Sequence, residues 1–141
     1  MAEALDIIPW KHPKQLDNTI GDILGGEDNF KTAMLVGTKD LGSVVESSEI
    51  YVGLIYLSPG ATYPQHAHDA TELYHTLLGS GLWGPTLRHL KTVKPGNFVL
   101  HASAQPHTFK VRSEILEQCN ISPLFLILQA LLLKHYIKRF L

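Results

Sequence analysis

The chain has 141 residues, of which 45% are hydrophobic and 18% are charged, with a formal net charge of −1 and one cysteine. This length predicts a single domain that can bury a core without disulfide bonds, and a lone cysteine cannot form an internal disulfide. The near-neutral charge argues against nucleic acid as a partner, because nucleic-acid binding usually needs a basic face.

No targeting or membrane-spanning segment is predicted. The N-terminal residues have no basic region followed by an apolar run, so we expect no signal peptide. The longest apolar run, residues 124–133, is interrupted by Gln129 and is far shorter than the roughly 20 residues that a membrane span needs. We therefore expect a cytoplasmic protein without a membrane span.

Residues 1–30 predict a short helical or irregular lead-in. Leu16, Ile20, Ile23 and Leu24 recur at helical spacing, and the glycine pair that begins at Gly25 would end the helix. We expect this segment to pack on the outside of the domain, and a lid over a site is the alternative.

Residues 31–120 have the pattern of an all-β domain. Short β-branched and aromatic runs are separated by turn signals, such as Pro59-Gly60 and Pro95-Gly96. This spacing predicts a β-sandwich or a barrel. Strands are expected at residues 32–36, 49–57, 62–68, 72–78, 87–93, 97–100 and 107–111, with a short one around Trp83.

Residues 121–141 form a tail of different composition. Residues 121–133 are almost wholly apolar, and Lys134, Lys138 and Arg139 make the end basic. A final buried strand running into a helix is one interpretation. The other is a dimer-forming or membrane-surface tail.

The residues between 60 and 79 carry the strongest functional signal. His66 and His68 are two apart, as are Glu72 and Tyr74, and alternate residues of a strand point to one face. The short link between the two pairs predicts an antiparallel hairpin that places them side by side. His107, near the start of a later strand, would complete the set from across the barrel.

Three imidazoles and one carboxylate suit a divalent transition metal, Zn, Fe, Mn, Co or Ni, without choosing among them. A closed set of four ligands would make a structural site, whereas an open set would leave room for a substrate. The alternative is a group of surface histidines on a polar loop. We predict one bound metal ion.

The motifs resemble those of the cupin superfamily. The pattern Gly-x5-His-x-His-x3-Glu-x6-Gly fits at every position from Gly60 to Gly79, and Pro95-Gly96 followed by Pro106-His107 is similar to the second cupin motif. The resemblance implies a single-domain cupin, which is a double-stranded β-helix or jelly-roll barrel, over residues 31–120.

A narrower resemblance is to the cupin-type dimethylsulfoniopropionate (DMSP) lyases. It rests on the run from Tyr63 to His75 and on Gly79, Trp83, the Pro95-Gly96 turn, His101 and the Pro106-His107 pair. Carried over by position, the resemblance implies that the metal ligands are His66, His68, Glu72 and His107 and that the general base is Tyr74. It also implies β-elimination that releases dimethyl sulfide and acrylate.

Three further residues are candidates for substrate binding. Tyr63 matches a position of the family's substrate pocket, and the aromatic faces of Tyr63 and Trp83 suit the sulfonium cation. His101 would line the pocket mouth or orient a ligand.

Other functions stay open: an oxygenase or a sugar isomerase of the same fold, or a non-catalytic cupin that binds metal or a small molecule. A homodimer is expected on family analogy.

Overall fold

The computed structural model of the chain describes residues 8–11, 29–112 and 124–130, the last of these by their backbone. Within these residues the regular structure is almost entirely β. The predicted helix between residues 16 and 24 and the end of the tail, residues 131–141, lie outside the described residues. The strands are β1 (Phe30–Gly37), β2 (Val45–Glu46), β3 (Ile50–Leu57), β4 (Thr62–His66), β5 (Thr71–Leu78), β6 (Gly81–Gly84), β7 (Lys91–Val93), β8 (Phe98–His101), β9 (His107–Val111) and β10 (Leu124–Ala130), with a short 3₁₀ turn, η2 (Lys39–Leu41).

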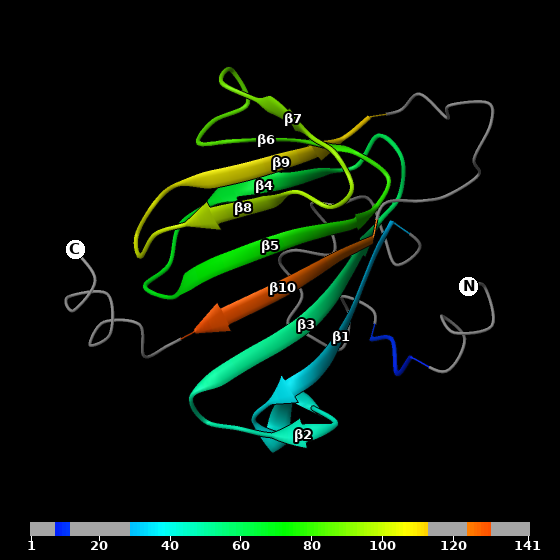
Figure 1. Cartoon of the computed structure of the whole chain (residues 1–141), viewed down its shortest axis with the longest axis vertical. Helices are drawn as coiled ribbons and strands as arrows, with labels where there is room; N and C mark the ends of the chain where they lie inside the picture. Colours follow the sequence, from blue (N-terminus) through cyan, green and yellow to red (C-terminus); the bar gives the residue numbers. More distant parts are fainter. Residues whose placement is uncertain (1–7, 12–28, 113–123, 131–141) are drawn as a thin grey trace.

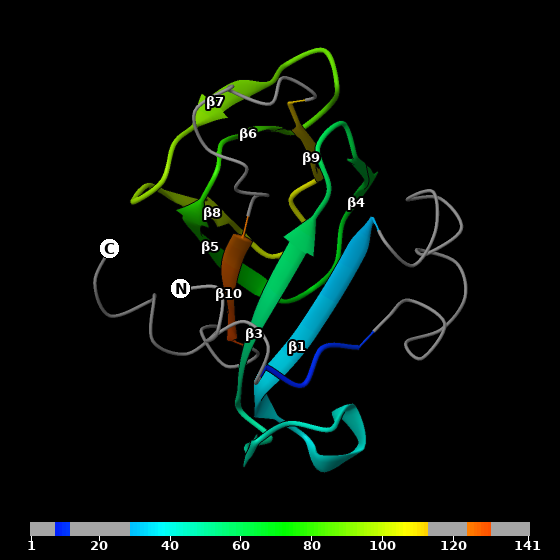
Figure 2. The same cartoon turned by 90° about the vertical axis from the view of Figure 1, so that its right-hand side faces the viewer.

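The strands form two sheets. One has the order β2-β1-β3-β10-β5-β8 and the other the order β4-β9-β6-β7. Figure 1 shows the larger sheet running across the molecule and the smaller sheet above it, and Figure 2 shows the two sheets curving around a shared interior. Most neighbouring strands are antiparallel, and β10 lies between β3 and β5 although it follows them by many residues in the sequence.

The interior between the sheets is aromatic. Because alternate residues of a strand share a face, Glu72, Tyr74 and Thr76 of β5 are buried, whereas their neighbours are only half-buried. A buried cluster joins both sheets through side chains that point inward. Its members are Phe30, Ile55, Leu57, Tyr74, Trp83, Phe109 and Val111.

A second apolar cluster lies on the outer face of the larger sheet. Ala33 of β1 and Leu54 of β3 are buried there, and the described N-terminal residues Ile8 and Trp10 pack against them. Lys11 is paired with Thr32 of β1 through backbone hydrogen bonds of 2.7 and 3.0 Å. This segment therefore packs on the outside of the domain.

Three elements differ from the sequence expectation. The strand predicted at residues 62–68 ends at His66, so His68 is not on it. The run at residues 87–93 is a strand only at Lys91–Val93, because Thr86 and His89 close a turn on each other and Leu87 is 57% exposed. The link after β1 contains the short parallel strand β2. No helix in the described residues has the length and the hydrophobicity that crossing a membrane requires.

Candidate metal centre

The four predicted ligands come from both sheets. Glu72 lies on the inner face of β5, in the six-stranded sheet, while His66 and His107 are directly paired residues of β4 and β9 in the four-stranded sheet. His68 lies in the link that leads from β4 to β5. We call these four residues the His–Glu cluster.

The predicted hairpin between β4 and β5 is wrong. β4 pairs with β9, and β5 pairs with β10 and β8, so the link after His66 is a corner between two sheets. A link of this length can close a hairpin or cross between sheets, and burying the inner faces of both strands requires the crossing. His107 is across the interior from Glu72, but it is the immediate strand neighbour of His66.

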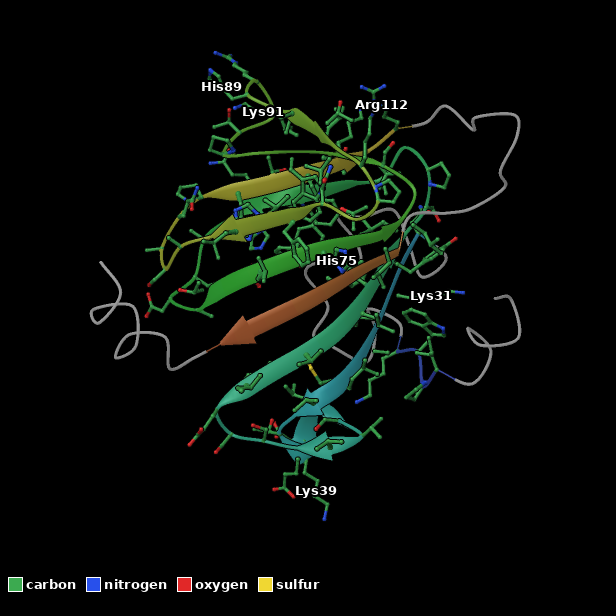
Figure 3. All side chains as sticks on the ribbon, viewed as in Figure 1. Lys31, Lys39, His75, His89, Lys91 and Arg112 are labelled. Carbon is green, nitrogen blue, oxygen red and sulfur yellow. The ribbon has the colours of Figure 1, made fainter. Side chains whose placement is uncertain are left out.

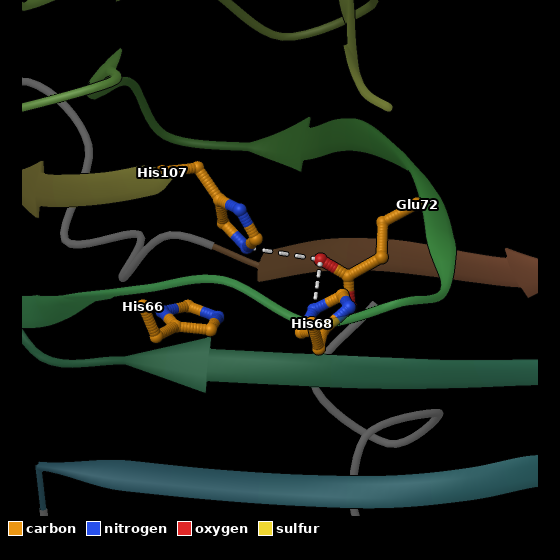
Figure 4. Close-up of side chains that lie close together, drawn as sticks. All are labelled: His66, His68, Glu72 and His107. Atoms are coloured by element: carbon orange, nitrogen blue, oxygen red, sulfur yellow. Dashed lines mark ion pairs between the residues drawn. The ribbon is translucent and has the colours of Figure 1, made fainter. Parts of the chain in front are cut away.

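The cluster is compact. The candidate ligand atoms of its four residues all lie within 4.8 Å of one another. Oε2 of Glu72 is 3.1 Å from Nε2 of His68 and 3.1 Å from Nε2 of His107 (Figure 4). Glu72 and His107 are almost fully buried, whereas His66 and His68 are half-buried, so the cluster is reached from the side of His66 and His68.

Backbone carbonyls orient two of the imidazoles. Nδ1 of His66 lies 2.8 Å from the carbonyl oxygen of Pro64, and Nδ1 of His107 lies 2.9 Å from that of Gln105. A carbonyl can only accept, so Nδ1 of each ring carries a hydrogen, and in the neutral ring Nε2 has a free lone pair. This is the tautomer that a metal ligand needs.

The donor set fits a divalent metal ion. Both ring nitrogens of His68 and Nε2 of His107 are buried without a partner in hydrogen-bond geometry among the described residues, and such atoms are costly to leave unsatisfied. Burial lowers the pKa of His66. For His107, burial opposes protonation, but the contacts with Glu72 and the Gln105 carbonyl outweigh it and raise the pKa. A bound metal ion would satisfy these nitrogens, and at His107 it would take the place of the proton that the raised pKa favours on Nε2.

Tyr74 extends the cluster. Its hydroxyl donates a hydrogen bond of 3.0 Å to Oε2 of Glu72. Burial, followed by the negative charge of Glu72, raises the pKa of Tyr74 well above 10 in the absence of a metal ion. The prediction that Tyr74 shares one face of its strand with Glu72 is confirmed, and this face is the buried one.

Tyr63 lies beside His66, with ring centroids 4.9 Å apart. These residues are three apart, so regular alternation would put them on opposite faces. The β4–β9 register shifts between Tyr63 and His66, and this irregularity aims both rings at the same side. Burial raises the pKa of Tyr63 to about 12.

Trp83 and His101 are both buried in the interior, so His101 does not lie at a pocket mouth, which was one of the two predictions for it. Trp83 is 3% exposed and His101 is 4% exposed. The ring of His101 is stacked on that of His107, with a centroid distance of 4.2 Å, and it lies 6.0 Å from Trp83. Burial, and then the charge of His107, lower the pKa of His101 to about 4.

Phe109 is a residue of the site that was not predicted from the sequence. Its ring is fully buried and is stacked on Tyr63 at 5.0 Å and on Trp83 at 4.2 Å, so it joins the two predicted substrate contacts. Phe109 is two residues after His107 on one strand, and the period of two could have revealed it. The contacts from the carbonyls of Pro64 and Gln105 could not be predicted from the sequence, because every residue has a carbonyl group.

Comparison with solved structures defines the fold class as cupin. The crystal structure of the DMSP lyase DddQ from Ruegeria pomeroyi DSS-3 is similar with a TM-score of 0.68 and 24% identity, covering 90% of this chain and 58% of that one. A cupin-superfamily sugar phosphate isomerase from Silicibacter pomeroyi is similar with a TM-score of 0.62 and 17% identity, covering 89% of this chain and 73% of that one.

The family follows from the sequence match. A model of the dimethylsulfoniopropionate lyase family matches residues 2–116, so the chain belongs to that family. Dimethylsulfoniopropionate lyase DddQ of Ruegeria pomeroyi is 30% identical over 89 residues, which are 62% of this chain and 43% of that protein. The chain thus spans less than half the length of this curated relative.

Proposed function

We propose that this chain is a metal-dependent carbon–sulfur lyase that cleaves DMSP into dimethyl sulfide and acrylate, with Tyr74 as the general base. The observation that carries the proposal is the 3.0 Å hydrogen bond from the Tyr74 hydroxyl to Glu72. It puts a proton-transferring group beside a candidate metal site in a member of the DMSP lyase family.

The reaction is a β-elimination. With Tyr74 in its deprotonated form, the carbon next to the carboxylate loses a proton to the phenolate Oη of Tyr74, and its C–H electron pair forms the double bond of acrylate. The bond between the β-carbon and sulfur breaks, and its electron pair leaves on sulfur as neutral dimethyl sulfide. The Tyr74 proton then returns to solvent.

His66, His68, Glu72 and His107 would hold the metal. A divalent cation there would bind the substrate carboxylate, stabilise the charge that develops towards it, and favour the phenolate form of Tyr74. Among Zn, Fe, Mn, Co and Ni the donor set makes no choice, and elimination needs no redox-active ion.

Tyr63 and Trp83 are proposed to receive the sulfonium group. Aromatic faces attract cations, and Tyr63, Phe109 and Trp83 form a continuous stack that reaches Tyr74 through a centroid distance of 4.7 Å between Tyr74 and Trp83. A sulfonium on this wall would have its β-carbon near the base.

The test is incubation of the metal-loaded protein with DMSP and headspace detection of dimethyl sulfide. Tyr74→Phe should lower the rate by about 10²–10⁴-fold, the usual contribution of a general base, with metal content unchanged. Tyr63→Phe is the matched control, because it keeps the aromatic face and should lower the rate only severalfold.

No dimethyl sulfide above a His107→Ala control would reject the lyase proposal. In that case another small-cupin activity, such as an oxygenase or isomerase, or a non-catalytic binding role would remain. If Tyr74→Phe kept the full rate, the lyase proposal would stand but the base assignment would not.

We also propose that the chain forms a homodimer through β8. This strand is at the edge of the six-stranded sheet and, among the described strands, pairs only with β5. Its outward residues Phe98 and Leu100 are each 61% exposed. A free edge is complementary to itself under two-fold symmetry, so pairing with a second copy would cover both side chains.

A cytoplasmic location remains a prediction from the sequence.

A further inference from the structure

Most polar side chains in the interior have assigned partners or roles. Among the described residues the buried polar side chains are Glu72, Thr76, His101, His107 and Thr108. Glu72 and His107 belong to the His–Glu cluster, and Oγ1 of Thr108 donates to the carbonyl of Tyr63 at 2.6 Å. The polar atoms of the other two, Thr76 and His101, have no hydrogen-bond partner in the described part of the chain. These are the side chains still free to meet a ligand.

Thr76 and His101 differ in their distance from the His–Glu cluster along the strands. His101 of β8 lies directly opposite Glu72 of β5, so both are on the rung that carries the cluster. Thr76 is four residues further along β5, which is about 13 Å at the usual rise of a strand. A small ligand bound at the cluster can therefore contact His101 but not Thr76.

In the part of the chain that the structure describes, no buried cation competes for an anionic ligand. The described lysine and arginine side chains are exposed or half-buried, and the labelled Lys31, Lys39, Lys91 and Arg112 extend from the periphery of the molecule (Figure 3). Among the described residues, a carboxylate entering the interior meets the imidazoles of the cluster and His101, and no ammonium or guanidinium group.

We propose that His101 donates a hydrogen bond to the carboxylate of the substrate and so fixes which end of the substrate faces the cluster. The proposal rests on the proposed function and deepens it. An imidazole carries at least one N–H in either tautomer, and burying that N–H without a partner is unfavourable. A carboxylate beside His101 satisfies it.

This contact also orients the reacting carbon. The Tyr74 hydroxyl reaches back to the rung of Glu72 and His101, where it lies 3.0 Å from Oε2 of Glu72. The carbon attached to a carboxylate held on that rung therefore comes next to the hydroxyl. The substrate class that fits is a short propionate with its leaving group on the β-carbon, pointing towards Tyr63 and Trp83.

The test uses the zinc-loaded protein and two unreactive probes, propionate and trimethylsulfonium, with NMR titration as the readout. His101→Phe keeps a ring that can stack on His107 but removes the donor. We expect it to weaken propionate binding about tenfold or more, as for loss of a hydrogen bond to a charged group. His101→Gln keeps a donor and should bind propionate within about threefold of the native protein. Trimethylsulfonium binding should not change in either variant.

Propionate binding by zinc-loaded His101→Phe at the native affinity would overturn the proposal. If that variant does not retain zinc, the native protein provides the test. The ring N–H proton signal of His101 is assigned by its loss in His101→Gln. This signal must shift in the native protein when propionate is added. No shift would likewise overturn it. Because neither probe is turned over, these outcomes are separate from whether the protein releases dimethyl sulfide.

Discussion

Oε2 of Glu72 is the atom on which the site converges. It accepts the Tyr74 hydroxyl and lies 3.1 Å from the Nε2 atoms of both His68 and His107. A buried carboxylate needs several favourable contacts to remain charged. The position of Glu72 therefore links metal binding to the orientation of the proposed base.

Removing one ligand should abolish tight metal binding without unfolding the barrel. We expect His107→Ala to weaken metal affinity by about 100-fold or more, because loss of supporting residues around a metal site alone costs about 10–100-fold. Isothermal titration with Zn²⁺ measures the change. His75→Ala is the control, since His75 is on the opposite face of β5, where its ring stacks on Phe98 at 4.2 Å. Equal losses in the two variants would contradict the assignment.

The metal-free protein should lose stability in mild acid because of His101. Its pKa is lowered from 6.5 to about 4 by burial and then by the charge of His107. Between these values the unfolded chain binds a proton at this position and the folded chain does not, so the free energy of unfolding falls as the pH drops through this window. The expected loss at pH 5 is about 2 kcal/mol.

Denaturant unfolding of the metal-free protein at pH 7 and pH 5 measures this loss. The groups facing His101 are the His–Glu cluster and Tyr74, and His107 has the opposite sign because its pKa is raised. Comparison with His101→Phe isolates the contribution of His101, since only this residue stops titrating. The same pH dependence in both proteins would show that the loss has another source.

At the level of elements, the turns decide where the strands can meet. The loop after β6 folds back so closely on Gly84 that a Cβ atom there would lie 1.8 Å from the carbonyl oxygen of His89. This close approach sets the course of β7 beside β6. Pro95-Gly96, in contrast, turns the chain into β8 in open space, and Gly96 needs only its positive φ of 85°.

Gly84→Ala should therefore destabilise the fold more than Gly96→Ala. The first forces backbone to move, which we expect to cost about 3 kcal/mol, at the upper end of overpacking effects. The second places alanine in the left-handed region at a cost of about 1–2 kcal/mol. Urea unfolding curves of the two variants compare these costs, and a smaller effect at Gly84 would contradict the close approach of the loop to this residue.

On the scale of the whole molecule, the two faces of the six-stranded sheet have different roles. Its inner face carries Glu72 and Tyr74 towards the other sheet. Its outer face is covered by Ile8 and Trp10 at the β1–β3 side, whereas Phe98 and Leu100 on β8 are exposed. An uncovered apolar edge is a liability for a lone chain in water.

Leu100→Lys should shift the proposed homodimer towards monomer. A charge on the outward face of β8 opposes pairing of this edge with a second copy. Sedimentation velocity of the two proteins at the same concentration measures the shift, and Leu87→Lys is the control, because Leu87 is also exposed, at 57%, but lies in the loop before β7. An unchanged dimer in Leu100→Lys would place the interface elsewhere.

The all-β class, most strand positions and the four members of the cluster could be predicted from the sequence alone. Residue type and a period of two were sufficient for the strands, because they act over neighbouring residues. The choice of the four cluster residues rested on their types and on the spacing of the cupin-like motifs, since His68 lies beyond the end of β4. The period of two also predicted that Tyr74 shares the face of Glu72, which its hydrogen bond confirms.

The way these residues meet, in contrast, depends on the tertiary structure. It put β4 and β5 in opposite sheets, made His66 and His107 direct neighbours, and turned Tyr63 inward through an irregular register. It also placed His101 opposite Glu72. The pairing of distant strands depends on burying the inner faces of both sheets at once. This burial involves residues from the whole chain, so it cannot be predicted from a short stretch of sequence.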